Sequence, residues 1–284
     1  MVGQQITKNS DPYAPIRKVP LDYNGIKSNA YSVQLEDWAK TGTDINGKPE
    51  YGTKWQEKGI VSENYLLIPN HEVKEMAESI ASAAPMDWQE NKVFFNGKQY
   101  MYSMTTNRVT SEVKVGDDIS LGFAMWNSYD GSRALTFQMF LNRLVCMNGM
   151  VTKKHFSSHR FKHDPTSANW QEDLEQVCDM IHNVEGSVDK YVSSFRNMTR
   201  KHSLDSFDLR DIRENYLPKV PTSTWGKIID KFLCDSDEST YNTWDLLNAG
   251  TNITWHNKKQ TMQDFNMNGY IVEGLCDYSN KVSA

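Results

Sequence analysis

The sequence lacks a long apolar run, since no stretch of about 18 consecutive hydrophobic residues occurs in it. Its first residues, MVGQQITKNSDPY, also lack the apolar core and the small-residue cleavage site of a secretory signal. These two absences argue against insertion into a membrane and against secretion. We therefore expect a protein of the cytoplasm, with no membrane among its partners.

Cysteine is scarce, and familiar catalytic signatures are missing. Cys146, Cys178, Cys234 and Cys276 are widely spaced, so the sequence contains neither a C-x-x-C metal knuckle nor a dense disulfide framework. We expect reduced and mostly buried thiols. The sequence also lacks H-E-x-x-H, G-x-S-x-G and a G-x-G-x-x-G between a strand and a helix. We therefore predict no cofactor and lean against catalytic activity.

Acidic residues are absent from one stretch of the chain, between Arg133 and His163. The formal net charge of the whole chain is -5, which gives no reason by itself to expect an anionic partner. Within this stretch, however, the basic residues Arg133, Arg143, Lys153, Lys154, Arg160 and Lys162 occur with no Asp or Glu. Such segregation is typical of an anion-facing surface on an otherwise acidic protein. An even spread would place only about four acids there, so chance stays open as an explanation.

Apolar and aromatic residues are plentiful enough for a large core. Hydrophobic residues make up 38% of the chain, which includes 8 Trp, 13 Tyr and 11 Phe, and aromatic side chains bury a large area each. Residues 1–60 are the exception, since prolines and polar residues predominate there. We predict an extended arm with short elements, partly ordered at best, for this part. Residues 61–268 are predicted to form the core domain, and residues 269–284 an irregular tail.

The core is predicted to be α+β. Residues 70–84 have helical apolar spacing, with Asn70 as the N-cap and Pro85 after the end. Turn signals at Asn96-Gly97, Asp130-Gly131 and Asn148-Gly149 then divide residues 92–163 into short segments typical of strands. Together they predict an antiparallel meander sheet of about five or six strands.

The helical half is predicted for residues 166–250. Apolar residues recur there in alternating steps of four and three, which is typical of one long helix that packs through an apolar seam. The seam consists of Trp170, Leu174, Val177, Ile181, Val184, Val188, Tyr191, Phe195 and Met198, with Gly186 as a candidate bend. Shorter helices are predicted at 204–217, 222–234 and 241–249. The sheet is therefore expected to be backed by a long C-terminal helix and by shorter helices, although a self-associating coiled coil stays open.

The segment KKHFSSHRFKHD holds the densest group of reactive side chains. His155, His159 and His163 share a face, because a spacing of four suits both a strand and a helix. On a strand, neighbouring imidazoles would lie about 13 Å apart, which is too far for one zinc ion. Only a helix or a tight loop would therefore make this a metal site.

Binding of single-stranded nucleic acid requires less of the same segment. It needs donors for phosphate oxygens beside an aromatic plane on which a base can stack, and Phe156, Arg160 and Lys162 supply these on one strand face. A solvated edge strand, protected by its charge from pairing with another edge, is the alternative interpretation.

Carboxylates offer an enzymatic alternative. Asp117, Asp118 and Asp130 lie at predicted turns, where Asp is favoured for local backbone hydrogen bonds. We favour that turn role over catalysis. Cys146, close to Asn148, would serve as a nucleophile only with a base nearby, and nothing in the sequence places one.

Several motifs together resemble a known family. They are WNSYDGSRALTFQMFLNRLVCMNGMV, HRFKHD and TWDLLNAGTNITWH, which contain Asn127, Ser128, Asp130, Gly131, Arg143, Val145, Cys146, Asn148, His163, Trp244, Leu247, Asn248 and Ala249. Over residues 68–256 the chain is similar to the phage/plasmid-like proteins of domain of unknown function 932, although Asp245 stands where that family usually has Gly. The resemblance implies a phage, prophage or plasmid setting and no known activity. It also implies that a site should be sought around Arg143, Cys146 and Asn148.

Our leading hypothesis is a phage-encoded protein that binds or anneals single-stranded nucleic acid in replication or recombination. Its affinity would come mainly from phosphate neutralisation and would fall steeply with salt. The nucleic-acid contacts are assigned to Arg133, Arg143, Lys153, Lys154, Phe156, Arg160 and Lys162, with Asn127, Asp130, Cys146 and Asn148 as the surrounding motif. The alternatives are an interaction protein that inhibits a host defence or host enzyme, and a metal-dependent hydrolase that uses the three histidines with Asp130 or Asp164. A homo-oligomer and a host protein are further expected partners, and the host cytoplasm is the expected location.

Overall fold

Two antiparallel sheets contain the strands of the protein. The computed structural model describes residues 11–23, 26–84, 86–144, 148–151, 158–161, 170–200, 203–236, 241–256 and 262–282, and the structural statements below concern these residues. The N-terminal sheet has the order β1 (Ile16–Tyr23), β2 (Ile26–Thr43) and β3 (Pro49–Ser62). The second, six-stranded sheet has the order β4 (Gln89–Phe95), β5 (Gln99–Lys114), β6 (Asp117–Ser128), β7 (Thr136–Arg143) and β8 (Asn148–Val151), with β9 (Ser158–Arg160) also paired to β7.

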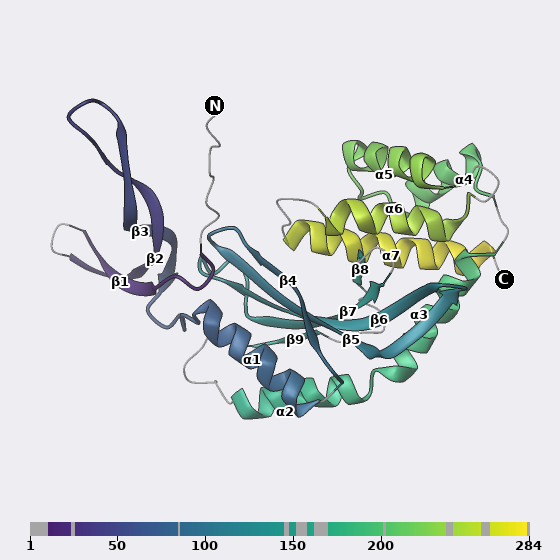
Figure 1. Ribbon diagram of the computed structural model, residues 1–284, viewed down its shortest axis with the longest axis horizontal. Helices are drawn as coiled ribbons and strands as arrows, with labels where there is room; N and C mark the ends of the chain where they lie inside the picture. The colour runs from purple at the N-terminus through teal and green to yellow at the C-terminus, as the bar shows by residue number, and fades with distance from the viewer. Residues whose placement is uncertain are drawn as a thin grey trace.

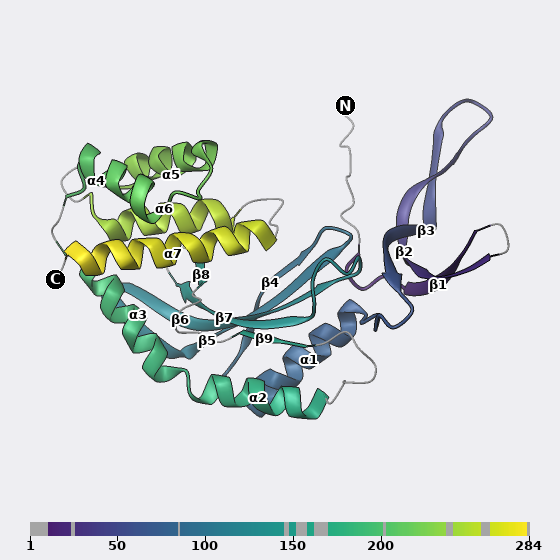
Figure 2. The same ribbon diagram turned by 180° about the vertical axis from the view of Figure 1, so that it is seen from behind.

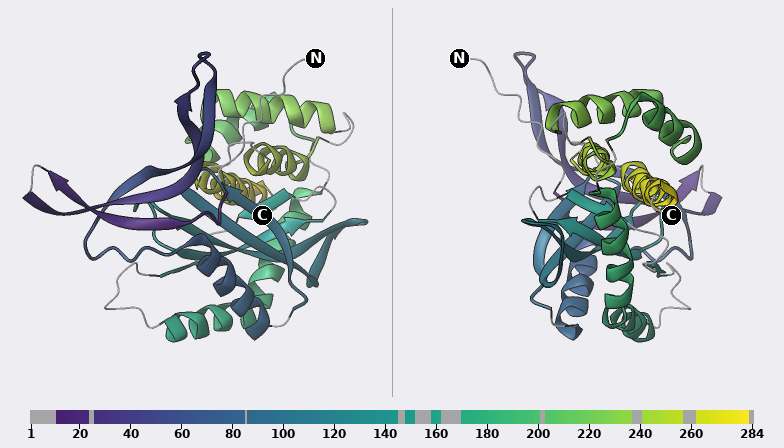
Figure 3. Two further views of the ribbon diagram at one scale, coloured as in Figure 1. Left: turned by 60° about the vertical axis from the view of Figure 1, so that its left-hand side comes forward. Right: turned by 90° about the vertical axis from the view of Figure 1, so that its right-hand side faces the viewer.

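Helices cover both faces of the six-stranded sheet (Figure 1). One face carries α1 (Asn70–Ala83), α2 (Trp170–His182) and α3 (Glu185–Met198), and the other carries α6 (Thr243–Trp255) and α7 (Met262–Val282). An outer layer above α6 and α7 is formed by α4 (Ser206–Asp211), the π-helical η1 (Ile212–Tyr216) and α5 (Thr222–Asp235), as the view from behind also shows (Figure 2). The N-terminal sheet projects away from these layers (Figures 1 and 3). None of the described helices has the length and the apolar character needed to cross a lipid bilayer.

Strand β7 shows why the sheet needs cover on both faces. Every residue from Phe137 to Asn142 is buried. Because neighbouring residues of a strand point to opposite faces, Phe137 and Leu141 pack in the main core, whereas Phe140 packs against Trp255 of α6 with ring centroids 5.1 Å apart. Burial of each such side chain contributes roughly 1.5–3 kcal/mol. The apolar character of TFQMFLNR on both faces therefore places this strand in the middle of the molecule.

The predicted fold class is confirmed, since the protein is α+β with an antiparallel meander sheet backed by helices. The hairpin predicted at Asn96-Gly97 joins β4 to β5, and Gly97 has a φ of 89°. This positive φ is the conformation that glycine adopts without strain. Asn96 Oδ1 accepts a hydrogen bond from Gln99 N at 2.8 Å, which closes the turn.

Asn70 has a different role from the predicted N-cap. Pro69 occupies the N-cap position of α1, and no side chain caps the helix. The Asn70 side chain is used for tertiary contacts instead: Nδ2 donates to Pro12 O at 2.9 Å, and Oδ1 accepts from Asn127 Nδ2 at 3.1 Å. The cap prediction is therefore wrong, because the residue joins three distant segments rather than its own helix end.

The turn predicted at Asn148-Gly149 is also wrong. Both residues belong to β8, where they pair with Arg143 and Asn142 of β7. A Cβ atom on Gly149 would lie 2.4 Å from the ring of Trp255. Glycine is therefore required here for close packing against an aromatic ring, a role that the local sequence cannot distinguish from a turn.

The helical half differs from the prediction at two places. The single long helix is two helices, α2 and α3, which separate at Asn183 and Val184. The tail predicted to be irregular from residue 269 is helical, because α7 continues to Val282. Glycine lowers helix propensity, yet Gly274 lies so close to Leu217 that an added Cβ would be 2.6 Å from it. Tertiary packing therefore stabilises a helix that local propensity does not predict.

The N-terminal residues predicted as an arm with short elements form long strands. Strand β2 has 18 residues and β3 has 14. Their pairing continues from Ala30 opposite Ser62 to Thr43 opposite Pro49, with two irregularities. The prolines on which the prediction relied lie outside this long pairing or at its end, so they do not interrupt it.

Candidate functional site

The predicted basic surface lies only partly within the described residues. Those outside are Lys153, Lys154, Phe156 and Lys162, together with Cys146, His155, His163 and Asp164. The structure describes Arg133, Arg143 and Arg160, and it places the backbone of Asn148 in β8.

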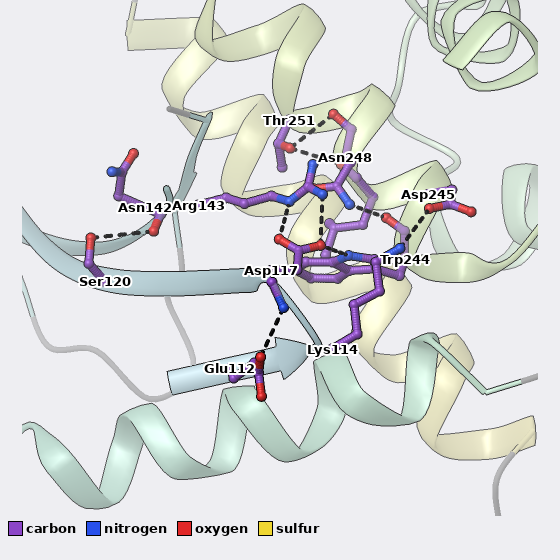
Figure 4. Close-up of polar contacts among 12 residues, drawn as sticks. Glu112, Lys114, Asp117, Ser120, Asn142, Arg143, Trp244, Asp245, Asn248 and Thr251 are labelled. Carbon is purple, nitrogen blue, oxygen red and sulfur yellow. Dashed lines mark hydrogen bonds and ion pairs between the residues drawn. The ribbon is translucent and has the colours of Figure 1, made fainter. Parts of the chain in front are cut away.

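Arg143, at the end of β7, forms a buried ion pair with Asp117 at the start of β6 (Figure 4). Arg143 Nε donates to Asp117 Oδ1 at 2.6 Å, and Nη2 donates to Oδ2 at 2.7 Å. Trp244 Nε1, from α6, donates to the same carboxylate at 2.9 Å. The positive charge of Arg143 is therefore neutralised inside the protein. The turn role predicted for Asp117 is wrong, because its side chain bonds to these two distant partners.

The charged groups around this pair shift one another's pKa values. Burial by itself would raise the pKa of the Asp117 carboxyl, but hydrogen bonds from Arg143 and Trp244, with the charges of Arg143 and Lys114, lower that pKa below its usual value. For Asp245 the opposite holds: burial raises the pKa of its carboxyl despite the nearby positive charges. Lys114 Nζ lies 4.0 Å from Asp245 Oδ1. Two acids and two bases thus meet where the sheet ends against α6.

A polar pocket of about 230 Å³ opens beside this cluster. It is lined by Lys114, Arg143, Lys231, Asp235, Ser236, Asp245, Asn248, Ala249 and Asn252. These residues come from β5, β7 and α6, and from α5 together with the residue that follows it. The pocket therefore lies where the sheet meets two helices. Arg143, Asn248 and Ala249 also belong to the motifs that carry the family resemblance. The fold therefore brings parts of two distant motifs to one site.

Arg133 and Arg160 lie at the other end of β7. Arg160 pairs with Thr136, the first residue of that strand, so it is about 24 Å along the strand from Arg143. Arg133 is largely buried, with its guanidinium carbon 4.9 Å from the centroid of the Trp126 ring. Burial, with the nearby charge of Arg160, lowers the pKa of Arg133 to about 10. Of the three described arginines of the basic segment, only Arg160 is exposed. The fold therefore does not gather the three guanidinium groups on one surface.

His159, one of the three histidines considered as metal ligands, already has a carboxylate partner. Its Nε2 lies 2.7 Å from Oδ1 of Asp173 in α2. Within the described parts of the chain, no three His, Cys, Asp or Glu side chains are grouped as a metal site would require. These residues therefore give the proposed metal site no support.

Asn127, near the end of β6, and Asp130, in the turn that follows, both have structural contacts. Asn127 is fully buried, and its Nδ2 donates to Ile68 O at 2.9 Å. Asp130 Oδ1 accepts from Ser132 N at 3.0 Å, which confirms the turn role predicted for Asp130. A Cβ on Gly59 of β3 would lie 2.4 Å from Asp130 Cα. This turn is therefore the place where the N-terminal sheet joins the body of the protein.

Three large aromatic side chains of the N-terminal sheet are exposed to solvent. Trp38 is 49%, Tyr51 57% and Trp55 37% exposed. Trp38 of β2 pairs with Thr53, which lies midway between the two aromatic residues of β3. Because paired residues and alternate residues share a face, all three rings lie on one face. We call Trp38, Tyr51 and Trp55 the aromatic face.

Positively charged side chains lie on the same side of the sheet as the aromatic face. The guanidinium carbon of Arg17 lies 4.0 Å from the centroid of the Trp55 ring, within cation–π distance. Lys40 is exposed and pairs with Tyr51. Two acids lie on the same side: Glu36, which is half-buried and pairs with Trp55, and Glu57, which is exposed and pairs with Gln34. Sequence reasoning missed this face because the region was interpreted as an arm. The available signal was the spacing of four between Tyr51 and Trp55 in KPEYGTKW, which places both rings on one face of a strand.

A comparison with protein families matches residues 58–268 to the model described as Domain of unknown function (DUF932). The chain belongs to this family. The resemblance predicted from the sequence is thereby confirmed. No curated protein and no solved structure matches the chain. The DUF932 part contains the Arg143–Asp117 ion pair and the polar pocket, whereas the aromatic face lies before it.

Proposed function

We propose that this protein binds single-stranded nucleic acid through the aromatic face. The observation that carries the proposal is the row of three exposed rings with Arg17 and Lys40 on the same side of the sheet. In the phage or plasmid setting that the family resemblance implies, the bound strand would be held or annealed during replication or recombination. Two residues of the basic segment contribute less than expected, because Arg143 is bound to Asp117 and Arg133 is largely buried.

The spacing of the rings supports this choice of partner. Tyr51, Trp38 and Trp55 follow one another along the paired strands in steps of about 7 Å. Each ring therefore has room for a base, and stacking of one base on an aromatic side chain contributes about 1–3 kcal/mol. Arg17 and Lys40 supply positive charge for the phosphates between the bases. In a duplex the faces of the bases are already stacked on their neighbours, so this surface favours a single strand.

A protein partner, such as a host protein inhibited by this chain, is the competing class. Exposed apolar patches also mark protein interfaces. The aromatic face differs from a mainly apolar interface because cations accompany its rings, one of them stacked on Trp55. Although Glu36 and Glu57 balance the formal charge of this face, Arg17 on Trp55 and Lys40 beside Tyr51 place cations next to the rings, as stacked bases with their phosphates require. The protein-partner alternative becomes one outcome of the test. The hydrolase alternative has no supporting observation among the described residues.

The test is binding of a fluorescein-labelled oligo-dT, followed by anisotropy at low and moderate salt. Trp38→Ala is expected to weaken binding about ten-fold, because one stacking platform is lost. Phe207→Ala is the matched control, since Phe207 is an aromatic residue of α4 that is 73% exposed and far from the aromatic face. Lys40→Ala should reduce the slope of log K against log salt by about 0.7, as expected for one lost phosphate contact to a single strand.

Two results would overturn the proposal. One is the absence of a salt-dependent anisotropy change at micromolar protein, and the other is equal affinity of Trp38→Ala, Phe207→Ala and the unmodified protein. A stoichiometric host protein that is captured regardless of nuclease treatment, and is lost only in Trp38→Ala, would assign the face to a protein partner instead.

A further inference from the structure

Two neighbouring pockets lie along α5 and α6, two helices that are side by side in the helical layers (Figure 1). We call them the two compartments of a groove. The first compartment is the polar pocket described above, of about 230 Å³. The second has a volume of about 420 Å³ and combines apolar walls from Pro221, Ile253 and Met267 with polar groups. Asn252 lines both compartments, so they meet at this residue. Together they have the size of a small-molecule site, which typically spans ~300–1,000 Å³.

Positive side chains approach the polar compartment from opposite sides. Lys231 belongs to α5, and Lys114 is the last residue of β5. Lys231 Nζ lies 2.6 Å from Asp235 Oδ2, an i,i+4 pair whose side chains are 30% and 58% exposed. Exposed pairs of this kind are weak, and Lys114 is held more loosely still, at 4.0 Å from Asp245. An incoming anion can therefore replace Asp235 as the partner of Lys231 at little cost.

We propose that this groove binds a phosphorylated nucleoside, with the phosphate in the polar compartment and the base and sugar in the larger one. Lys114 and Lys231 donate to the phosphate oxygens, as lysine commonly does. The walls formed by Pro221, Ile253 and Met267 cover the flat apolar faces of the base. Carboxamide groups are suited to the edges of bases, and Asn252 lies where the two parts of the ligand would join.

Arg143 contributes to this site while it keeps its ion pair with Asp117. Its bidentate bond to Asp117 fixes the guanidinium in the wall of the polar compartment. The two lysines, by contrast, have weak partners and adjust to the ligand. The site lies within the part of the chain that matches DUF932, and the aromatic face lies before that part. Binding in the groove is therefore independent of binding at the aromatic face.

Isothermal titration calorimetry on the full chain with AMP, adenosine and inorganic phosphate tests the proposal. AMP should bind about ten-fold or more tightly than either adenosine or phosphate, because only AMP fills both compartments. Lys231→Ala should weaken AMP binding about ten-fold through loss of one charged donor, and it should leave adenosine binding unchanged. Lys190→Ala, an exposed lysine of α3 away from the groove, is the matched control.

The proposal is overturned by no heat of binding with AMP at millimolar concentration, by equal affinity for adenosine and AMP, or by a Lys231→Ala variant that binds AMP as the control does. The nucleotide bound in the groove could be free or could be the phosphorylated end of a nucleic-acid strand. To distinguish these sources, the affinities of oligonucleotides with a 5′-phosphate and with a 5′-hydroxyl are compared in the Trp38→Ala variant, whose aromatic face is weakened. A preference for the 5′-phosphate identifies the end of a strand, and equal binding of the two identifies a free nucleotide. Failure of oligo-dT binding with retained AMP binding would remove only the function proposed above.

Discussion

Arg143→Met and Asp117→Leu are each expected to lower the free energy of unfolding strongly. The side chains of Asp117 and Arg143 are only 4% and 16% exposed, so either substitution leaves a largely buried charge without its partner. Loss of one partner from a buried ion pair typically costs about 3–5 kcal/mol. In Asp117→Leu the indole donor of Trp244 also loses its acceptor, and a buried unsatisfied donor costs about 1–3 kcal/mol.

The double substitution is expected to cost much less than the sum of the two single ones. Replacement of both charges by apolar side chains of similar size leaves no uncompensated ion, and such replacements are often close to neutral. What remains is mainly the cost of the Trp244 donor, about 1–3 kcal/mol. The interaction energy of the double-mutant cycle should therefore be at least about 3 kcal/mol.

Urea unfolding at neutral pH, followed by tryptophan fluorescence and circular dichroism, measures the free energy of unfolding of each variant. Single substitutions that cost under about 1 kcal/mol, or that add up to the cost of the double variant, would refute the buried-pair reasoning. Oligonucleotide affinity provides an independent check under conditions where the variants are folded. If Arg143 contacted nucleic acid, Arg143→Met would lose affinity without a comparable loss of stability, contrary to our expectation.

Two further predictions concern packing and pH. Gly149→Ala should lower the urea midpoint, because overpacking against the Trp255 ring costs about 1–3 kcal/mol. Gly226→Ala in α5 is the control: nothing lies within 4 Å of an added Cβ there, so this change should stabilise the protein by up to about 1 kcal/mol. Equal effects of the two substitutions would contradict the packing role of Gly149. Because the folded pKa of Asp117 lies below its unfolded value, this carboxylate contributes stability above about pH 4 that is lost as the pH falls through the folded pKa. Acid unfolding of Asp117→Asn should therefore depend less on pH, and an unchanged dependence would disprove this assignment.

Signals that act over a few residues predicted much of the fold. Asn96-Gly97 and Asp130-Gly131 defined the ends of strands because their turn chemistry is local. The apolar spacing of α1 likewise placed Val73, Ala77 and Ile80 in the core, where the structure has them. Where the same residue types had a tertiary role, as Gly149 and Gly274 do, the local signal indicated the wrong element.

The ion pair at the candidate site could not be predicted from local sequence. Asp117 is separated from Arg143 by 26 positions and from Trp244 by 127. The family resemblance marked Arg143 and Trp244 separately, but not the acid that joins them. Charge patterning identified Arg143 as one of a group of cations without showing that a neighbouring strand supplies its counter-ion. The pairing of β6 with β7 brings Asp117 close to Arg143, and the packing of α6 brings Trp244 to the same carboxylate.

The contact between Gly59 and the turn at Asp130 joins the N-terminal sheet to the body at a point where two backbones touch without an intervening side chain. The match to DUF932 begins at residue 58, one position before that glycine. Because β3 continues to Ser62, the match includes the end of this strand and the point where the sheet meets the body. A larger residue at position 59 would push the sheet away from the body, so the direction in which the aromatic face points depends on one absent side chain.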